Sequence, residues 1–185
     1  MRIIAIIPAR GGSKRLKNKN IFPFNGKPLI AYAIDACKKS SFINQVYVSS
    51  DDNEILKVSK KYGAIGLLRD SKFSDDHTPK IVAIREILKQ KELLKDGNPD
   101  IVIIPQANSP EITSSNIDEG LRLMFKYNLW EVMSADENGV QNAAFRIVKR
   151  EHINNEFLSA HCGFVTANIT DIHTIEDIKK LEKKN

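Results

Sequence analysis

The chain begins with MRIIAIIPARGGSKRLKNKN (residues 1–20), in which an apolar run changes abruptly into a loop rich in glycines and cations. Residues 3–7 are all apolar and Pro8 ends the run, which is the pattern of a short strand buried on both faces. Gly11 and Gly12 follow at once, and five lysines and arginines lie between positions 10 and 19. Glycines let backbone N–H groups approach a ligand closely, and cations offset the ligand's charge. The stretch therefore predicts a buried strand that ends in an anion-binding loop.

Beyond this stretch, apolar runs of strand length alternate with segments of helical period. We expect strands at residues 3–7, 45–49, 64–68, 101–105, 131–134 and 143–148, and helices at 29–39, 53–61, 79–94, 116–127 and 175–183. This alternation predicts an α/β fold with a parallel or mostly parallel sheet and helices on both faces. The length of 185 residues suits one sizeable core, so we expect a single domain over residues 1–185.

Composition and charge exclude several classes of protein. The net charge is +5, but the basic residues concentrate in the first loop and in a lysine-rich tail at 179–184, without the interleaved aromatic residues of a single-strand binding platform. We therefore expect no nucleic-acid partner. Cys37 and Cys162 lie far apart, no zinc-ligand spacing is present, and the first apolar run is too short for a signal or membrane segment. These features predict a cytoplasmic protein with free thiols and no membrane contact.

The loops after the strands are where a ligand is expected, because in sheets of this kind the ligand site lies outside the carboxyl ends of the strands. Three predicted loops meet that condition, at residues 9–20, 49–52 and 106–110, and we expect all three to open onto one face. The first loop matches neither GxxxxGKS/T nor GxGxxG, which excludes a P-loop and the usual dinucleotide fingerprint. From the residues alone, it is either a triphosphate-binding loop or a basic surface turn. His77, His152 and His161 match no motif, and we interpret them as surface or packed side chains.

Several ordered motifs resemble those of a known family. They are PARGGSKRLKNKN with GKPLI (8–20 and 26–30), VSSDDNEI (48–55), KYGA with Arg69, IIPQANSPEITSSNIDEGL (103–121), QNAAFRIVKREHI (141–153) and TDIHTIEDI (170–178). The chain resembles the cytidylyltransferases that activate sialic acid and related nonulosonic acids. The family patterns run close to PARGGSKRLPGKN, GKPLI, STDDEEI, LLQPTSPLR, NGAIY and DIDTPEDL. The resemblance covers nearly the whole chain.

The resemblance implies a Rossmann-like, three-layer nucleotidyltransferase fold and an enzyme that joins CTP to a 2-keto sugar acid. In that reaction the anomeric oxygen of the sugar attacks the α-phosphate, CMP is transferred and pyrophosphate leaves, while Mg²⁺ and protein cations neutralise charge. The resemblance also implies a homodimer. Three alternatives stay open: a Kdo-type cytidylyltransferase, a catalytically weakened relative, and a non-catalytic nucleotide-binding relative.

Roles for individual residues follow from the same resemblance. The catalytic set is Arg10, Lys19 and Asp171; the nucleotide-binding set is Ala9, Arg10, Gly11, Gly12, Ser13, Lys14, Lys19, Asp51 and Arg69; and the substrate-binding set is Gln106, Asn108 and Ser109. Simpler interpretations stay open for several of these. Asp51 is equally well placed to be the N-cap of the next helix, Arg69 to form a surface ion pair, and residues 106–109 to form a capped turn. Lys14 and Arg15 either assist the phosphates or point to solvent.

Two departures from the family pattern affect the expected chemistry. Where the family has DID, this chain has Asp171, Ile172 and His173, and we expect Asp171 and His173 to be the metal ligands. Imidazole suits Mn²⁺ better than Mg²⁺, which predicts slow turnover with Mg²⁺ and partial rescue by Mn²⁺. The alternative is a shift of one position that makes His173 a surface residue. The segment near 128–142 is also shorter than the sugar-binding and dimer-forming arm of the family, which predicts a weaker dimer or poorer binding of the acid.

Overall fold

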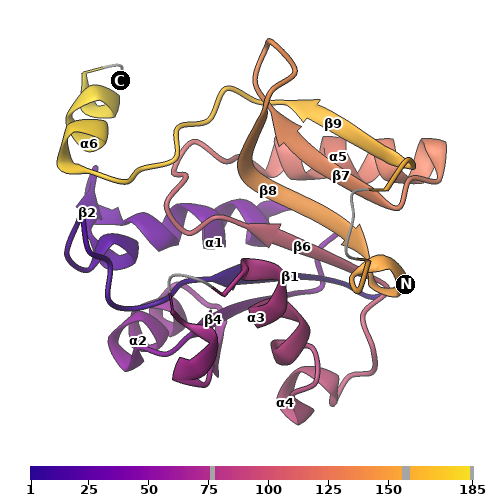
Figure 1. Cartoon of the computed structure of the whole chain (residues 1–185), viewed down its shortest axis with the longest axis horizontal. Coiled ribbons are helices and arrows are strands. Elements are labelled where there is room, and N and C mark those ends of the chain that lie inside the picture. Colours follow the sequence, from indigo (N-terminus) through magenta and orange to yellow (C-terminus); the bar gives the residue numbers. More distant parts are fainter. Residues whose placement is uncertain (76–77, 156–158, 184–185) are drawn as a thin grey trace.

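The computed structural model describes residues 1–75, 78–155 and 159–183, and His77 lies outside these ranges. The described residues form a large sheet with helices on both faces (Figure 1). The strands of this sheet are β1 (Ile3–Pro8), β4 (Gln45–Ser50), β5 (Ile65–Leu68), β6 (Ile101–Pro105), β7 (Glu131–Ala135), β8 (Gln141–Lys149) and β9 (Cys162–Thr166). The helices are α1 (Leu29–Lys39), α2 (Asn53–Lys61), α3 (Lys80–Ile87), α4 (Lys91–Leu94), α5 (Ser114–Tyr127) and α6 (Ile175–Glu182). A small hairpin, β2 (Pro23–Phe24) and β3 (Lys27–Pro28), and the short helices η1 (Lys19–Ile21), η2 (Ser71–Phe73) and η3 (Arg150–His152) complete them.

The sheet is mostly parallel, as predicted. Its strand order is β5-β4-β1-β6-β8-β7-β9, in which β5, β4, β1 and β6 run parallel and β8 runs antiparallel to both of its neighbours. β9 pairs in parallel with β7 at the edge. In the parallel half, Ile6 of β1 lies opposite Tyr47 of β4, and Ala5 lies opposite Ile103 of β6. Because β1 is paired on both sides and covered on both faces, its sequence is an unbroken apolar run.

Alternate residues of β1 face two separate layers of the core. Ala5 and Ile7 pack with residues of α1, α2 and α5 on one face of the sheet. Ile4 and Ile6 pack with residues of α3 and α4 on the other face. Burial of one isoleucine side chain contributes about 1.5–3 kcal/mol to folding. β1 therefore joins both layers and holds the loop that follows it in a fixed position.

The carboxyl ends of β1, β4 and β6 meet at one edge of the sheet because these strands are parallel. The loops at 9–20, 49–52 and 106–110 all leave the sheet at this edge, as predicted. The segment 167–174 crosses the same edge, where the Ile172 N–H donates to the Asn108 carbonyl at 3.0 Å. Ile178 of α6 and Leu16 of the first loop then belong to one buried apolar cluster. The edge is thus enclosed by segments from both ends of the chain (Figure 1).

The predicted elements need three corrections. α1 and α2 begin and end where predicted, but the helix expected at 79–94 is two helices, because Gln90 is extended (φ −71°, ψ 133°) at the N-cap of α4. β9 was not predicted, since this edge strand is only partly buried and carries no continuous apolar run. The N-cap of α2 is Asp52, which accepts from the Glu54 and Ile55 N–H groups, and not Asp51.

Other expectations concern residues away from this edge. The rings of His152 and His161 pack on Trp130, with centroids 4.0 and 4.6 Å from the indole centroid. Cys37 is buried and Cys162 is half-buried, and both are free thiols. Among the described helices, none combines the length and the apolar character that a membrane span needs.

Candidate active site

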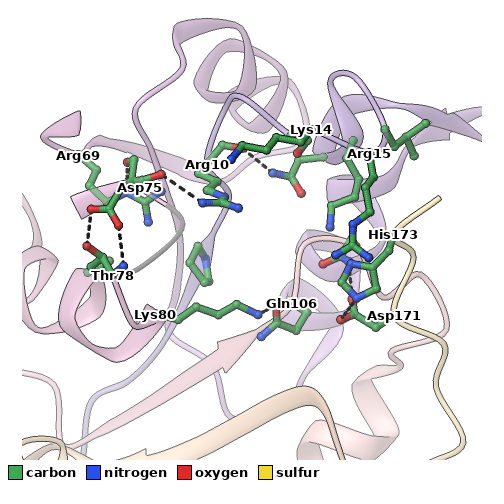
Figure 2. A pocket seen from close by; sticks show the side chains of 18 of the residues that line it. Arg10, Lys14, Arg15, Arg69, Asp75, Thr78, Lys80, Gln106, Asp171 and His173 are labelled. Atoms are coloured by element: carbon green, nitrogen blue, oxygen red, sulfur yellow. Dashed lines mark hydrogen bonds and ion pairs between the residues drawn. The ribbon is translucent and has the colours of Figure 1, made fainter. Parts of the chain in front are cut away.

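A pocket of about 420 Å³ opens at the carboxyl edge of the sheet. This volume lies within the range of roughly 300–1,000 Å³ that is usual for small-molecule sites. Its wall combines the first loop, the segment from the end of β5 to α3, the end of β6 and the segment before α6 (Figure 2). The lining residues are Pro8, Arg10, Ser13, Lys14, Arg15, Leu16, Lys19, Asn20, Arg69, Phe73, Ser74, Asp75, Thr78, Lys80, Ala83, Gln106, Asn108, Asp171 and His173.

The first loop is held against the end of β4 by hydrogen bonds from its backbone. The Ala9 N–H donates to the Ser49 carbonyl at 2.9 Å, and the Gly11 N–H donates to Asp51 Oδ1 at 2.9 Å. Asn20 Nδ2 closes the loop by donating to the Arg10 carbonyl at 2.9 Å. Gly12 has φ +64°, a left-handed backbone conformation that residues with a side chain rarely adopt. The glycines therefore shape the loop, while Arg10 and its neighbouring cations face the pocket.

Positive charge dominates the pocket wall. Six lining residues are cations (Arg10, Lys14, Arg15, Lys19, Arg69 and Lys80), whereas two are carboxylates (Asp75 and Asp171). In Figure 2, Arg69 and Asp75 lie on one side of the pocket, and Arg15, Asp171 and His173 lie on the other. Cations that converge on one cavity favour a ligand with several negative charges, because the ligand offsets their mutual repulsion. The wall is suited to a polyphosphate.

Burial and neighbouring positive charges lower the pKa values of two of the lysines that line the pocket. Burial lowers the pKa of Lys19, and the nearby charges of Lys80, Arg15 and Arg10 lower it further, whereas Asp171 raises it. Burial likewise lowers the pKa of Lys80, Arg10 adds to the effect and Asp171 opposes it. A bound polyanion would replace part of the lost hydration and restore both pKa values. The unliganded pocket therefore carries an electrostatic cost that an anion relieves.

Arg69 is fixed behind the first loop. It is 6% exposed, its Nε donates to Ser74 Oγ at 2.9 Å, and its guanidinium lies 3.8 Å from Asp51 Oδ1. Burial lowers the pKa of Arg69, and the charge of Asp51 opposes this shift. Asp51 also accepts from the Gly11 N–H, so its carboxylate joins the loop to Arg69. Arg69 lines the pocket, whereas Asp51 supports the residues that do.

Asp171 is positioned by Asn108 at the end of β6. Asn108 Nδ2 donates to Asp171 Oδ1 and, at 2.6 Å, to the Ile172 carbonyl. On the other side, His173 Nε2 lies 3.0 Å from Asp171 Oδ2. The His173 N–H donates to Asp177 Oδ2 at 2.9 Å, and Asp177 also closes the capping box of α6. The orientation of Asp171 and His173 thus depends on the fold of two distant segments.

The spacing of the Asp171 and His173 side chains is compatible with one metal ion. Asp171 Oδ2 and His173 Nε2 lie 3.0 Å apart, which is the length of a direct ion pair or hydrogen bond between them. Two neighbouring ligands about 2.1 Å from an octahedral ion are also roughly 3.0 Å apart. Within the described ranges, no cluster of three or more His, Cys, Asp or Glu side chains is arranged to hold a metal ion. Any ion at this pair would therefore take its other ligands from water or from a bound substrate.

The structure brings most of the sequence-predicted residues to one place. The pocket is lined by Arg10, Ser13, Lys14, Lys19, Arg69, Gln106, Asn108, Asp171 and His173. Ala9 is buried in the loop, Gly11, Gly12 and Asp51 lie behind it, and Ser109 is buried, with no hydrogen-bond partner for its hydroxyl among the described residues; none of these five lines the pocket. Their assigned contacts with nucleotide or substrate stay predictions.

Sequence reasoning missed several residues of the wall. Lys80 and Thr78 line the pocket but lie outside the loops that were expected to form it. Asn20 also lines the pocket and lies in the first of those loops, but no role was predicted for its side chain. Lys80 follows Pro79 at the predicted start of a helix and was interpreted only as part of that helix. A lysine beside a proline at a helix start gives no signal of this kind, because only the packing of α3 turns it toward the pocket.

Comparison with known families and proteins gives consistent matches. The model of the cytidylyltransferase family matches residues 4–156. A pseudaminic acid cytidylyltransferase of Campylobacter jejuni is 45% identical over 100 residues, which cover 52% of this chain and 43% of that protein. A CMP-N,N'-diacetyllegionaminic acid synthase of Legionella pneumophila is 40% identical over 111 residues, which cover 60% of this chain and 47% of that protein. The matched region thus spans less than half the length of these relatives.

Solved structures share the fold at low sequence identity. A CMP:2-keto-3-deoxy-manno-octonic acid synthetase complexed with CTP aligns with a TM-score of 0.79 at 15% identity, covering 100% of this chain and 98% of that one. Rv0371C of Mycobacterium tuberculosis in complex with manganese aligns with a TM-score of 0.71 at 10% identity, covering all of both chains. These likenesses support the Rossmann-like nucleotidyltransferase fold.

Proposed function

Because the chain belongs to the cytidylyltransferase family, we propose that it transfers CMP from CTP to a nonulosonic acid and releases pyrophosphate. The observation that carries the proposal is the pocket at the carboxyl edge, where six cations converge beside Asp171. The named relatives act on pseudaminic and legionaminic acids, which are 2-keto sugar acids of this kind. Their names supply the substrate class, and the charge of the pocket supplies the reason for a triphosphate.

Residues of the first loop would bind and orient the triphosphate. Arg10 and Lys19 offset the charge that moves toward the leaving pyrophosphate, and Lys14 and Arg15 extend the same positive wall. The acceptor's anomeric oxygen then attacks the α-phosphorus as the bond to pyrophosphate breaks, and its proton passes to solvent. Such a displacement needs alignment and charge neutralisation rather than a covalent intermediate on the protein. Arg69 would hold the nucleotide on the opposite wall.

A divalent metal belongs to this proposal, with Asp171 and His173 as its protein ligands. When bound, the ion neutralises phosphate charge and aligns the phosphate oxygens. Asn108 would keep Asp171 oriented toward the pocket through its Nδ2 bond. His173 offers a nitrogen, which Mn²⁺ accepts more readily than Mg²⁺ does. We therefore infer that Mn²⁺ supports this site better than Mg²⁺.

Residues 1–185 are proposed to act as one domain with a reduced dimer contact. α5 and β8 are separated by β7 and a tight turn, in which the Val140 N–H donates to Asp136 Oδ1 at 2.8 Å. A turn of this size leaves little chain for a dimer-forming arm. Sedimentation at micromolar and lower concentrations should detect a weak or absent dimer, and a tight dimer at nanomolar concentration would contradict this part of the proposal.

The deciding experiment measures pyrophosphate release from each of CTP, UTP, ATP and GTP. Each nucleotide is paired with N-acetylneuraminic, pseudaminic, N,N'-diacetyllegionaminic or 2-keto-3-deoxy-octonic acid, in Mg²⁺ and in Mn²⁺. Of the four nucleotides, we expect only CTP to release pyrophosphate, and only when a nonulosonic acid is present. CTP should also raise the melting temperature more than the other nucleotides do, because it binds the folded state. Release only with the eight-carbon acid would identify a Kdo-type enzyme, and a CTP-specific melting shift without release would identify a non-catalytic relative.

A further inference from the structure

A second pocket adjoins the first one, on the face of the sheet that carries α3. Its volume is about 180 Å³, and it lies between the start of α3, the end of β6 and the first half of β8. It is lined by Lys80, Ile81, Ile104, Gln106, Gln141, Ala143, Phe145 and Arg146. Lys80 and Gln106 line both pockets, whereas the first loop contributes no residue to the second. The two pockets therefore meet at Lys80 and Gln106.

The charge of the second pocket rests on Lys80. Arg146 is the other cation in the wall, but its Nε donates to Glu131 Oε2 at 2.8 Å, and Glu131 is 3% exposed. That pair neutralises itself within the protein. Lys80 Nζ donates at 2.6 Å to Gln106 Oε1, which is the oxygen of a neutral amide. Within the described ranges, Lys80 forms no ion pair within 4.0 Å, so its charge is available to a ligand.

The backbone of β8 is distorted where it forms the pocket wall. Ala143 has φ +50°, a left-handed conformation that is unfavourable for a residue with a Cβ atom. The pairing of β7 with β8 shifts register between Met133 and Ala135, in the same part of the hairpin. Bulges of this type bend a strand and re-aim its side chains, and they are common beside active sites. Because Ala143 lines the second pocket, this distortion lies in the pocket wall.

We propose that Lys80 binds the carboxylate of the acceptor in the second pocket and makes the enzyme selective for acidic acceptors. The inference rests on the proposed function, because it assigns the acceptor of that reaction. The first loop supplies four of the six pocket cations to a triphosphate, whereas an acceptor acid brings one further negative charge, and Lys80 lies where the two pockets meet. Ile81 and Ile104 offer apolar contact to the rest of the acceptor. With its carboxylate at Lys80, the acceptor lies at the boundary of the two pockets, next to the phosphates.

The test compares acids with their methyl esters, which keep the sugar and lose the charge. N-acetylneuraminic, pseudaminic and N,N'-diacetyllegionaminic acids and their esters are titrated calorimetrically into the protein with the non-hydrolysable α,β-methylene analogue of CTP. We expect the native chain to bind at least one acid tenfold or more tightly than its ester. Lys80→Met, which keeps the length of the side chain, should remove this preference. Because Lys80 also lines the first pocket, acid and ester are compared with the CTP analogue at saturation, so that a change in its affinity does not enter the ratio.

Lys91→Met is the matched control, because Lys91 is an exposed lysine of α4 that lines neither pocket. It should preserve the preference for the acid. Two results would overturn the inference: a Lys80→Met protein that still prefers the acid, or a native protein that prefers no acid over its ester. Weaker binding of the CTP analogue by Lys80→Met, with the preference intact, would instead assign Lys80 to the phosphates. The proposed function is judged separately, by pyrophosphate release and by the CTP-specific melting shift of the native chain.

Discussion

Replacement of Lys19 by methionine tests whether the cations of the pocket serve a ligand rather than the fold. Methionine keeps the length and apolar character of the lysine stem but removes the charge. A hydrogen bond to a charged group contributes about 1.5–3 kcal/mol. Since 1.36 kcal/mol corresponds to a factor of ten in rate, loss of this contact should lower kcat/KM by roughly 10-fold to 150-fold.

The same substitution should not destabilise the unliganded protein. Burial and the charges of Lys80, Arg15 and Arg10 lower the pKa of Lys19, and they outweigh the opposing effect of Asp171. The charged form of Lys19 is therefore held at a cost in the absence of a ligand. Lys19→Met should melt at the same temperature as the native chain or at a higher one, while its melting shift with CTP becomes smaller.

The assay combines steady-state pyrophosphate release with thermal melting, in the presence and absence of CTP. Lys17→Met is the matched control, since Lys17 is an exposed lysine of the same loop that does not line the pocket. It should change neither kinetics nor stability appreciably. The reasoning is refuted if Lys19→Met retains native kinetics, or if it loses several degrees of melting temperature without a ligand, because Lys19 would then be a structural residue.

Three further predictions follow from the pocket and its surroundings. His173→Asp should raise the rate supported by Mg²⁺ tenfold or more, which corresponds to about 1.4 kcal/mol of barrier. It should also enlarge the increase in melting temperature that Mg²⁺ adds to that of CTP. If the native and His173→Asp proteins have equal rates in Mg²⁺ and equal rates in Mn²⁺, His173 is not a metal ligand. Ala143→Gly should keep or raise stability, by up to about 1 kcal/mol in urea unfolding, because it relieves a positive φ, whereas Ala144→Gly at the buried neighbouring position should destabilise; similar losses in both would contradict this account. Folding lowers the pKa of Lys19, so between the lowered pKa and 10.5 the unfolded chain binds more protons at Lys19 than the folded chain does. The unfolding free energy of the native chain should therefore increase relative to that of Lys19→Met as pH rises through this range. A constant difference between the two unfolding free energies across the range would contradict the shift.

The parallel half of the fold could be predicted from the sequence because its signals are local. β1 is a continuous apolar run, and α1 and α2 show apolar residues at helical spacing that ends where the helices end. Strands that alternate with helices allow few arrangements, so the mostly parallel sheet and the common edge of three loops followed. The break at Gln90 and the edge strand β9 did not follow, because each depends on packing against distant segments rather than on local pattern.

The candidate site, like the fold, could be predicted from the sequence only in part. The cations of the first loop lie next to each other in the chain, so their grouping and their preference for a polyanion were determined by the sequence itself. The tertiary structure alone decided which side chains reach the pocket. Lys80 comes to the boundary of two pockets because α3 packs on the sheet, Asn108 is tied to Asp171 across 63 residues, and Ser109 is buried although it is the next residue along the chain. Local pattern specifies the period and the charge of a segment, whereas the direction of a side chain at a loop depends on contacts between segments that are remote in sequence.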